Sequence, residues 1–144
     1  VNKNIMSLGH ILPNRRRINN KNLFDKMAKP DYMEKTMSWI FGTFIMNILH
    51  MLMNKESRKR YHRFFLYGNI LHATKKEVED KVTEELNNYY TFFENHGCKH
   101  ILKAINILPK LLKYNNSDRT ILKKINLNTR VKPRRRSHNS ETSN

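Results

Sequence analysis

Three residues with metal-ligand chemistry lie close together in the second half of the chain. His96, Cys98 and His100 are separated by single residues, and imidazole and thiolate are both good ligands for zinc. The spacing matches no common zinc finger, the chain has one cysteine, and a fourth ligand would have to come from a distant histidine. We therefore interpret the segment as a turn between helices, and we expect no metal site and no other cofactor.

Catalytic chemistry has equally little support. A cysteine nucleophile needs a base held by a third group and donors for an oxyanion, and no local pattern around Cys98 supplies either. Carboxylates crowd onto one segment, namely Glu77, Glu79, Asp80, Glu84 and Glu85. Because paired catalytic acids usually come from different elements, we interpret this cluster as a solvated helix face that could also dock a basic partner. The sequence therefore predicts that the protein is not an enzyme.

Positive charge is the stronger signal. The 144 residues include 28 Lys and Arg against 12 Asp and Glu, a formal net charge of +16. A charge this high repels itself in a lone compact domain, and a polyanion relieves the repulsion. Nucleic acid is the commonest such partner, and an anionic membrane face is the second. The alternative is that the excess charge lies in solvated tails.

The candidate RNA-binding residues form four groups. They are Arg15, Arg16 and Arg17; Arg58, Lys59, Arg60 and Arg63; Lys99, Lys103, Lys110 and Lys113; and Arg134, Arg135 and Arg136. The second group is interleaved with aromatic residues from Tyr61 to Tyr67, and cations for phosphates beside rings that stack bases are typical of RNA binding. The alternative for that group is an amphipathic helix whose rings lie in a core and whose charges are solvated.

Residues 36–54 contain no charged side chain. As a helix they would be about 28 Å long, close to the hydrocarbon thickness of a bilayer. At a helical period their polar residues share one narrow stripe, formed by Thr36, Thr43, Asn47, His50 and Asn54. Such a helix is either buried, with its stripe against a polar partner, or a membrane span that turns the stripe towards another helix.

We favour the buried helix, in this protein or in an assembly, because the run is at the short end for a membrane span. The residues that we expect in the core are Trp39, Phe44, Ile48 and Leu52. The membrane alternative is a single-span subunit of a membrane complex, anchored by residues 36–54. In that case the excess of Lys and Arg after the span would place the C-terminal part on the cytosolic or matrix side.

Two further helices follow this segment. Thr74 and Glu77 have the spacing of a capping box, and one apolar face follows at Val78, Val82, Leu86, Tyr89 and Phe93. Residues 98–114 are amphipathic, with the lysines of the third group opposite an apolar face that runs from Ile101 to Leu112. Pro109 lies inside this pattern and is expected to kink or split the helix.

These patterns predict an all-α protein. We expect a domain of about four helices over residues 36–127, a basic N-terminal arm over 1–35 with a short helix near its end, and a basic and polar C-terminal tail over 128–144. The first residues are Arg-rich and poor in acid, as in a mitochondrial transit peptide, although a retained basic arm has the same composition.

The function that we expect from these features is that of a non-enzymatic structural subunit of a ribonucleoprotein, an organellar or divergent ribosome. Its partners would be RNA, above all rRNA, and neighbouring proteins of the assembly, with the mitochondrion as the expected location. The alternatives are the single-span membrane subunit, with the membrane as a partner through residues 36–54, and an exported helical parasite protein.

Overall fold

The computed structural model describes residues 12–13, 20–96 and 99–126, and all regular structure within them is helical. Its α-helices are α2 (Asn20–Met27), α3 (Pro30–Met51), α4 (Lys55–Tyr61), α5 (Lys75–Asn95) and α6 (Lys99–Leu111). A π-helical turn, η2 (His62–Leu66), continues α4, and the 3-10 turns are η3 (Asn69–His72), η4 (Asn116–Asp118) and η5 (Leu122–Lys124). The prediction of an all-α protein is confirmed, although the helical elements outnumber the four or so that we expected.

Helix α3 is the longest element, and it begins before the expected domain boundary at residue 36. Pro30 occupies its first turn, where the missing backbone N–H costs nothing and the fixed φ suits a helix. Residues 30–35 are therefore helical, and Lys35 Nζ donates to the carbonyl of Ser117 at 2.8 Å. This part of the expected N-terminal arm belongs to the folded domain.

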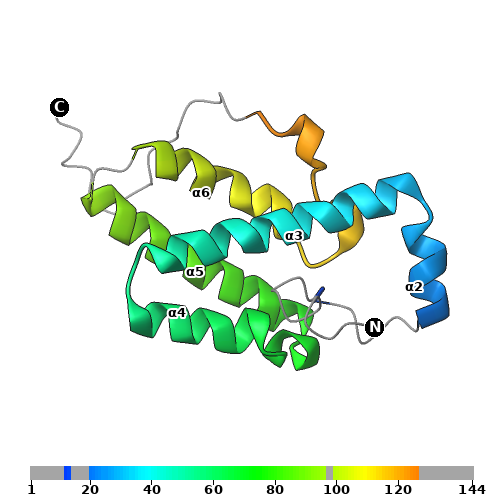
Figure 1. Cartoon of the computed structure of the whole chain (residues 1–144), viewed down its shortest axis with the longest axis horizontal. Helices are drawn as coiled ribbons and strands as arrows, with labels where there is room; N and C mark the ends of the chain where they lie inside the picture. The colour runs from blue at the N-terminus through cyan, green and yellow to red at the C-terminus, as the bar shows by residue number, and fades with distance from the viewer. Residues whose placement is uncertain (1–11, 14–19, 97–98, 127–144) are drawn as a thin grey trace.

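The helices pack around α3 as a central rod. In Figure 1, α3 crosses in front of α5, with α6 on one side and α4 on the other. Helices α5 and α6 pack against each other, and the segment carrying η4 and η5 returns along α3. The hydroxyl of Tyr90 on α5 donates to Asn106 on α6, which adds a polar link between these two helices.

One apolar core holds these elements together. Its fully buried large side chains come from α3, α4, η2, η3, α5 and α6; they include Trp39, Met46, Tyr61, Phe65, Ile70, Val78, Tyr89, Ile105, Leu108 and Leu111. Apolar side chains of Leu122 and Ile125 pack against its edge. The chain after α6 is thus part of the same core.

Helix α5 forms as predicted. The Thr74 hydroxyl accepts from the Glu77 backbone N–H at 3.1 Å, and the Thr74 N–H donates to the Glu77 carboxylate at 2.8 Å, which completes the capping box. Val78, Val82 and Phe93 are buried on its inner face. One member of the expected solvated acidic cluster is an exception, because Glu85 is completely buried.

Helix α3 faces the core with a different side from the one we expected. Trp39 is buried, but Phe44, Ile48 and Leu52 are exposed, so the prediction that they lie in this protein's core is wrong. The stripe residues Thr36, Thr43 and His50 are buried instead. The physical reason is that these polar groups find partners inside the domain, as when the Thr36 hydroxyl accepts from Asn116 at 3.1 Å.

Residues 36–54 also bear on the membrane alternative. Among the residues that the structure describes, none of the helices combines the length and the apolar character needed to cross a bilayer.

Candidate functional site

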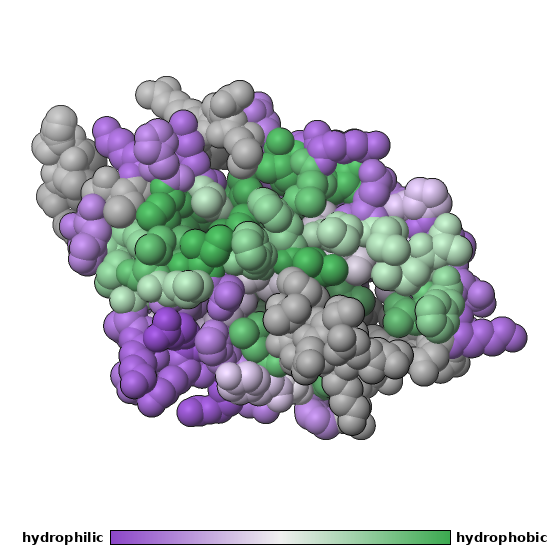
Figure 2. Space-filling model, in the orientation of Figure 1, coloured by the Kyte–Doolittle hydropathy of each residue, from purple (hydrophilic) through white to green (hydrophobic). Residues whose placement is uncertain are grey.

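Helix α4 presents its cationic residues on the side away from the core. Asn54 caps the helix by accepting from the Ser57 backbone N–H at 2.8 Å, and Ser57 and Tyr61 then point inwards. Lys59, Arg60 and Arg63 are consequently exposed, while Arg58 is half-buried. Figure 2 shows hydrophilic surface over the part of the molecule where Figure 1 places α4.

The aromatic residues interleaved with these cations are mostly structural. Tyr61 and Phe65 lie in the core, with ring centroids 5.2 Å apart, and Phe64 packs against it. Tyr67 is 73% exposed, and it follows the π-helical turn just before Gly68, whose φ of 98° favours glycine. Of these four rings, Tyr67 is therefore the one whose face is open to a base.

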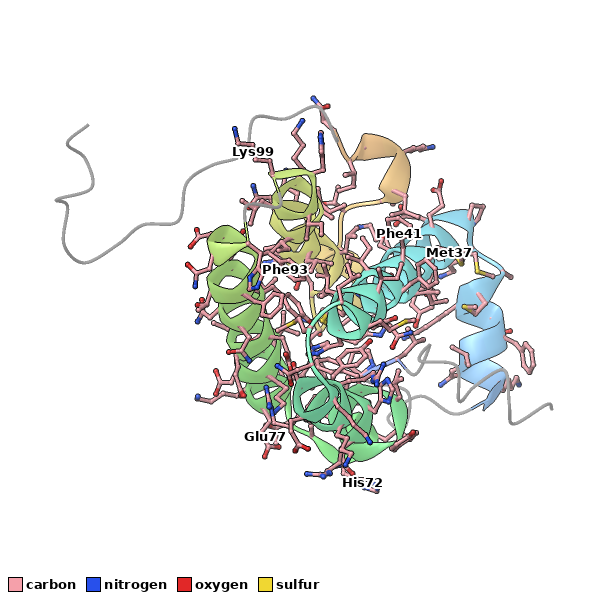
Figure 3. All side chains as sticks on the ribbon, turned by 60° about the vertical axis from the view of Figure 1, so that its left-hand side comes forward. Met37, Phe41, His72, Glu77, Phe93 and Lys99 are labelled. Carbon is pink, nitrogen blue, oxygen red and sulfur yellow. The ribbon has the colours of Figure 1, made fainter. Side chains whose placement is uncertain are left out.

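Helix α6 carries three of the four lysines of its group. Lys99 and Lys110 are exposed and Lys103 is half-buried, and Lys99 lies at the end of α6 in Figure 3. Pro109 does not split the helix, which continues to Leu111. Lys113 is exposed but follows the helix end, so the four lysines do not share one helix face as the sequence pattern predicts.

None of the candidate cations on α4, η2 and α6, nor Lys113, forms an ion pair with a described carboxylate. The acidic side chains of α5 are partly neutralised within their own helix, since Lys76 pairs with Asp80 at 2.7 Å and Lys81 with Glu84 at 3.6 Å. The positive charge of α4 and α6 is therefore open to an external anion.

A shallow pocket adds cations that the sequence analysis did not single out. It lies between α2, the start of α3 and η4, and its lining consists of Lys26, Lys29, Tyr32, Asn115, Asn116 and Ser117. Lys26 Nζ is 5.9 Å from the centre of the Tyr32 ring. Amines, amides and a ring around one hollow are suited to a phosphate with a neighbouring base.

Two groups of candidates lie outside the described residues: Arg15, Arg16 and Arg17, and Arg134, Arg135 and Arg136. Cys98 lies outside them as well. Of its neighbours, His96 stacks on Phe92 with centroids 4.3 Å apart and donates from Nδ1 to the Phe92 carbonyl at 2.6 Å. Among the described residues, no cluster of His, Cys, Asp and Glu could hold a metal ion.

A buried polar row joins three helices. His50 Nδ1 on α3 lies 2.8 Å from Ser57 Oγ on α4, and His50 Nε2 lies 3.1 Å from Glu85 Oε1 on α5. The second contact has the distance of an ion pair, although the ring N–H is not aimed along it well enough for a hydrogen bond. All three residues are at most 2% exposed.

Two tyrosines enclose this row. The ring of Tyr61 stacks on His50 at 4.6 Å, and its hydroxyl donates to the Thr43 carbonyl at 2.8 Å. Tyr89 contacts His50 edge-on at 5.1 Å. Burial, and then the charge of Glu85, raise the pKa of both tyrosines above their usual value.

A hydroxyl, an imidazole and a carboxylate in a row also occur in hydrolases, but here they lack access. A substrate carbonyl cannot reach the Ser57 hydroxyl through the side chains that bury it. We therefore interpret the row as a structural link. The sequence carried a signal for it, because Glu85 has helical spacing with Val82 and Tyr89 and so falls on the core face of α5.

Arg119 is a second residue that the sequence analysis missed. It is 3% exposed, its guanidinium lies 5.1 Å from the Trp39 ring, and it donates to the carbonyls of Lys113 at 2.8 Å and Tyr114 at 3.1 Å. Burial lowers its pKa to about 10, which leaves it charged at neutral pH. Arg119 thus binds groups inside the protein and does not add to the exposed positive charge.

Comparison of the chain with protein-family models, with curated proteins and with solved structures finds no match.

Proposed function

We propose that the protein is a non-enzymatic structural subunit of a ribonucleoprotein that binds RNA phosphates through its basic surfaces. The observation that carries the proposal is the set of exposed cations on α4 and α6 that form no ion pair with a described carboxylate. Cations of this kind bind phosphates by releasing condensed counterions, which gives affinity with little sequence specificity.

The geometry of α6 supports contact with more than one phosphate. Lys99 and Lys110 are eleven residues apart and therefore about 17 Å apart along the helix. Lysine acts as a mobile point charge and needs no fixed fork geometry, which suits an irregular RNA backbone. The pocket beside Lys26 and Tyr32 would hold a further nucleotide.

The basic arms, the kind of RNA, the protein partners and the location are proposed from the sequence. The arginines of residues 15–17 and 134–136 would extend from the helical domain as basic arms and follow folded RNA. We propose rRNA of an organellar or divergent ribosome as the RNA, neighbouring proteins of that assembly as further partners, and the mitochondrion as the location. The burial of the Ser57, His50 and Glu85 row supports a structural rather than a catalytic role.

A charge-reversal experiment tests the RNA surface. The variant Lys59→Glu/Arg60→Glu changes two exposed side chains of α4, and the matched control Lys75→Glu/Lys76→Glu makes the same change in charge at the start of α5. Binding of a fluorescently labelled single-stranded RNA to the full chain is measured by anisotropy at fixed salt. We expect at least about tenfold weaker binding for the α4 variant, because two phosphate contacts become repulsions.

The control should bind within a few-fold of wild type, since Lys76 is already neutralised by Asp80. Equal loss of affinity in both variants would mean that only net charge matters and that α4 is no RNA surface. Absence of RNA binding by the wild-type chain would remove the proposal itself.

A further inference from the structure

Helix α3 has a continuous apolar side that the fold leaves uncovered. Five of its side chains and that of its C-cap residue are 40–61% exposed: Met37, Phe41, Phe44, Ile48 and Met51, with Leu52 at the C-cap. We call these residues the apolar stripe. Figure 2 shows an apolar band along α3 with hydrophilic surface above and below it, and Figure 3 shows Met37 and Phe41 on the outer part of the helix.

The apolar stripe is not needed for the core. The opposite side of the same helix already supplies Trp39, Met46 and Leu49, each at most 3% exposed. From Met37 to Leu52 the stripe runs about 22 Å along the helix axis. Contiguous apolar surface of this extent is uncommon on a monomer and marks a place where something binds.

The surroundings of the stripe are basic. Helix α4 follows α3 and packs against it, and it exposes Lys55, Lys59 and Arg60. On another side, η5 packs against α3 and exposes Lys123, which pairs with Glu34 of α3 at 3.5 Å, and Lys124. Six of the described carboxylates lie on α5, Glu56 lies on α4, and α3 carries Asp31 and Glu34 near its start, before the stripe begins. The complementary surface is therefore apolar and negatively charged.

The apolar stripe could be covered by a helix of another protein, by a second copy of this chain or by an anionic bilayer, and the first two fit poorly. A partner helix is selected through charged residues beside its apolar seam, but the positions beside the stripe are neutral, as at Ile40 and Asn47. A second copy would bring another net charge of +16 against the first. An anionic bilayer requires no register, accepts Phe, Met, Ile and Leu in its outer hydrocarbon, and attracts the flanking Lys and Arg.

We propose that the apolar stripe and its flanking cations form a docking surface for an anionic phospholipid bilayer, with α3 lying in the plane of the interface. The helix rests on the membrane and does not cross it. Its polar residues Thr36, Thr43 and His50 stay inside the protein, so docking brings none of these three side chains into hydrocarbon, and Asn47 beside the stripe has a partner in His62 at 3.3 Å. This surface is separate from the RNA contacts of α6, but it shares Lys59 and Arg60 of α4 with the proposed RNA surface.

Vesicle sedimentation of the full chain tests the surface. The probes are vesicles of phosphatidylcholine mixed with anionic phosphatidylglycerol, and vesicles of phosphatidylcholine alone. We expect binding to the mixed vesicles and little to the neutral ones. Phe44→Glu should weaken binding by about tenfold or more, because an exposed ring that would insert into the bilayer is replaced by a charge that the membrane repels.

Phe24→Glu is the matched control, because Phe24 is 75% exposed on α2 and the change in charge is the same. It should bind like wild type, and Phe44→Gln, which adds no charge, should also bind weakly. Thermal unfolding by circular dichroism checks that each variant folds. Equal binding of wild type and Phe44→Glu would show attraction by charge alone and overturn the proposal. Absence of binding to the mixed vesicles would also overturn the proposal. If the wild-type chain were then a dimer and Phe44→Glu a monomer, the stripe would be covered by a second copy and not by a membrane.

Discussion

His50 on α3 and Glu85 on α5 meet in the middle of the core, with Nε2 and Oε1 3.1 Å apart and neither side chain exposed. A carboxylate buried to this degree is costly unless it is paired. The pair therefore links the central helix to the helix behind it at one register, and Ser57 extends the link to α4. We therefore expect the stability of the helical domain to depend on this contact more than on the surface ion pairs of the described residues.

The first prediction concerns this pair. His50→Ala and Glu85→Ala should each lower the free energy of unfolding by about 3–5 kcal/mol, because each leaves a buried polar partner alone. The double variant should lose clearly less than the sum of the two, since it removes both members of the pair. Urea unfolding of the four proteins measures the coupling free energy. Additive losses would mean that the two side chains do not interact.

The second prediction concerns Tyr89, whose buried hydroxyl has no hydrogen-bond partner among the described residues. Burial raises its pKa above the usual value, so the folded protein keeps a proton that the unfolded chain releases above about pH 10. Stability should therefore fall with rising pH above that value, by about 1.4 kcal/mol per pH unit for this group. Below that pH the group adds no pH dependence.

Tyr89→Phe should leave stability at pH 7 almost unchanged and should remove this part of the alkaline loss. Urea unfolding at pH 8 and at several values above 10 measures the difference from wild type. Tyr67→Phe, at an exposed ring, is the control and should keep the wild-type profile. If Tyr89→Phe follows the wild-type curve above pH 10, the hydroxyl is not held in its neutral form by the fold.

The third prediction concerns the close approach of α3 and the end of α6. A Cβ added at Gly42 would lie 2.6 Å from Leu112 Cδ2 and 3.3 Å from Leu111 Cβ. Gly42→Ala should therefore lower the free energy of unfolding by about 1–3 kcal/mol through overpacking, although alanine is the better helix former. Shortening the opposing side chain in Gly42→Ala/Leu112→Ala should make the alanine less harmful than it is alone. Stabilisation by the single substitution would show that the helices can separate freely.

Helix α5 could be predicted from local sequence because its information is local. The capping box at Thr74 and a single apolar face are both short-range patterns, and both are present in the structure. Helix α3 could not be oriented in the same way, because it is apolar on two sides. Which side faces inwards depends on partners such as Glu85 and Asn116, which come from distant parts of the chain.

The residues of the candidate site also differ in whether the local sequence predicts their exposure. Exposure of Lys59 and Arg60 follows from helical spacing against Ser57 and Tyr61, which periodicity reveals. The role of Arg119 could not be foreseen, since its partners are carbonyls at the end of α6 and the ring of Trp39, brought together by the tertiary fold.

The fourth prediction concerns the salt dependence of RNA binding. Lys59→Ala/Arg60→Ala should lower the slope of log K against log salt by about 1.4–1.8, because each lost phosphate contact removes roughly 0.7–0.9. Lys75→Ala/Lys76→Ala should leave the slope unchanged. The slopes come from anisotropy titrations at several salt concentrations. A slope equal to wild type in the α4 variant would place these two residues outside the interface.

Sedimentation of the native protein tests membership of a ribonucleoprotein most directly. A lysate of the source cells is separated on a sucrose gradient with and without ribonuclease, and the protein is detected by an antibody. Membership predicts that the protein sediments with large particles and moves to the top of the gradient after ribonuclease treatment. A protein that stays at the top without ribonuclease, or sediments unchanged after it, would contradict a structural role in a ribonucleoprotein.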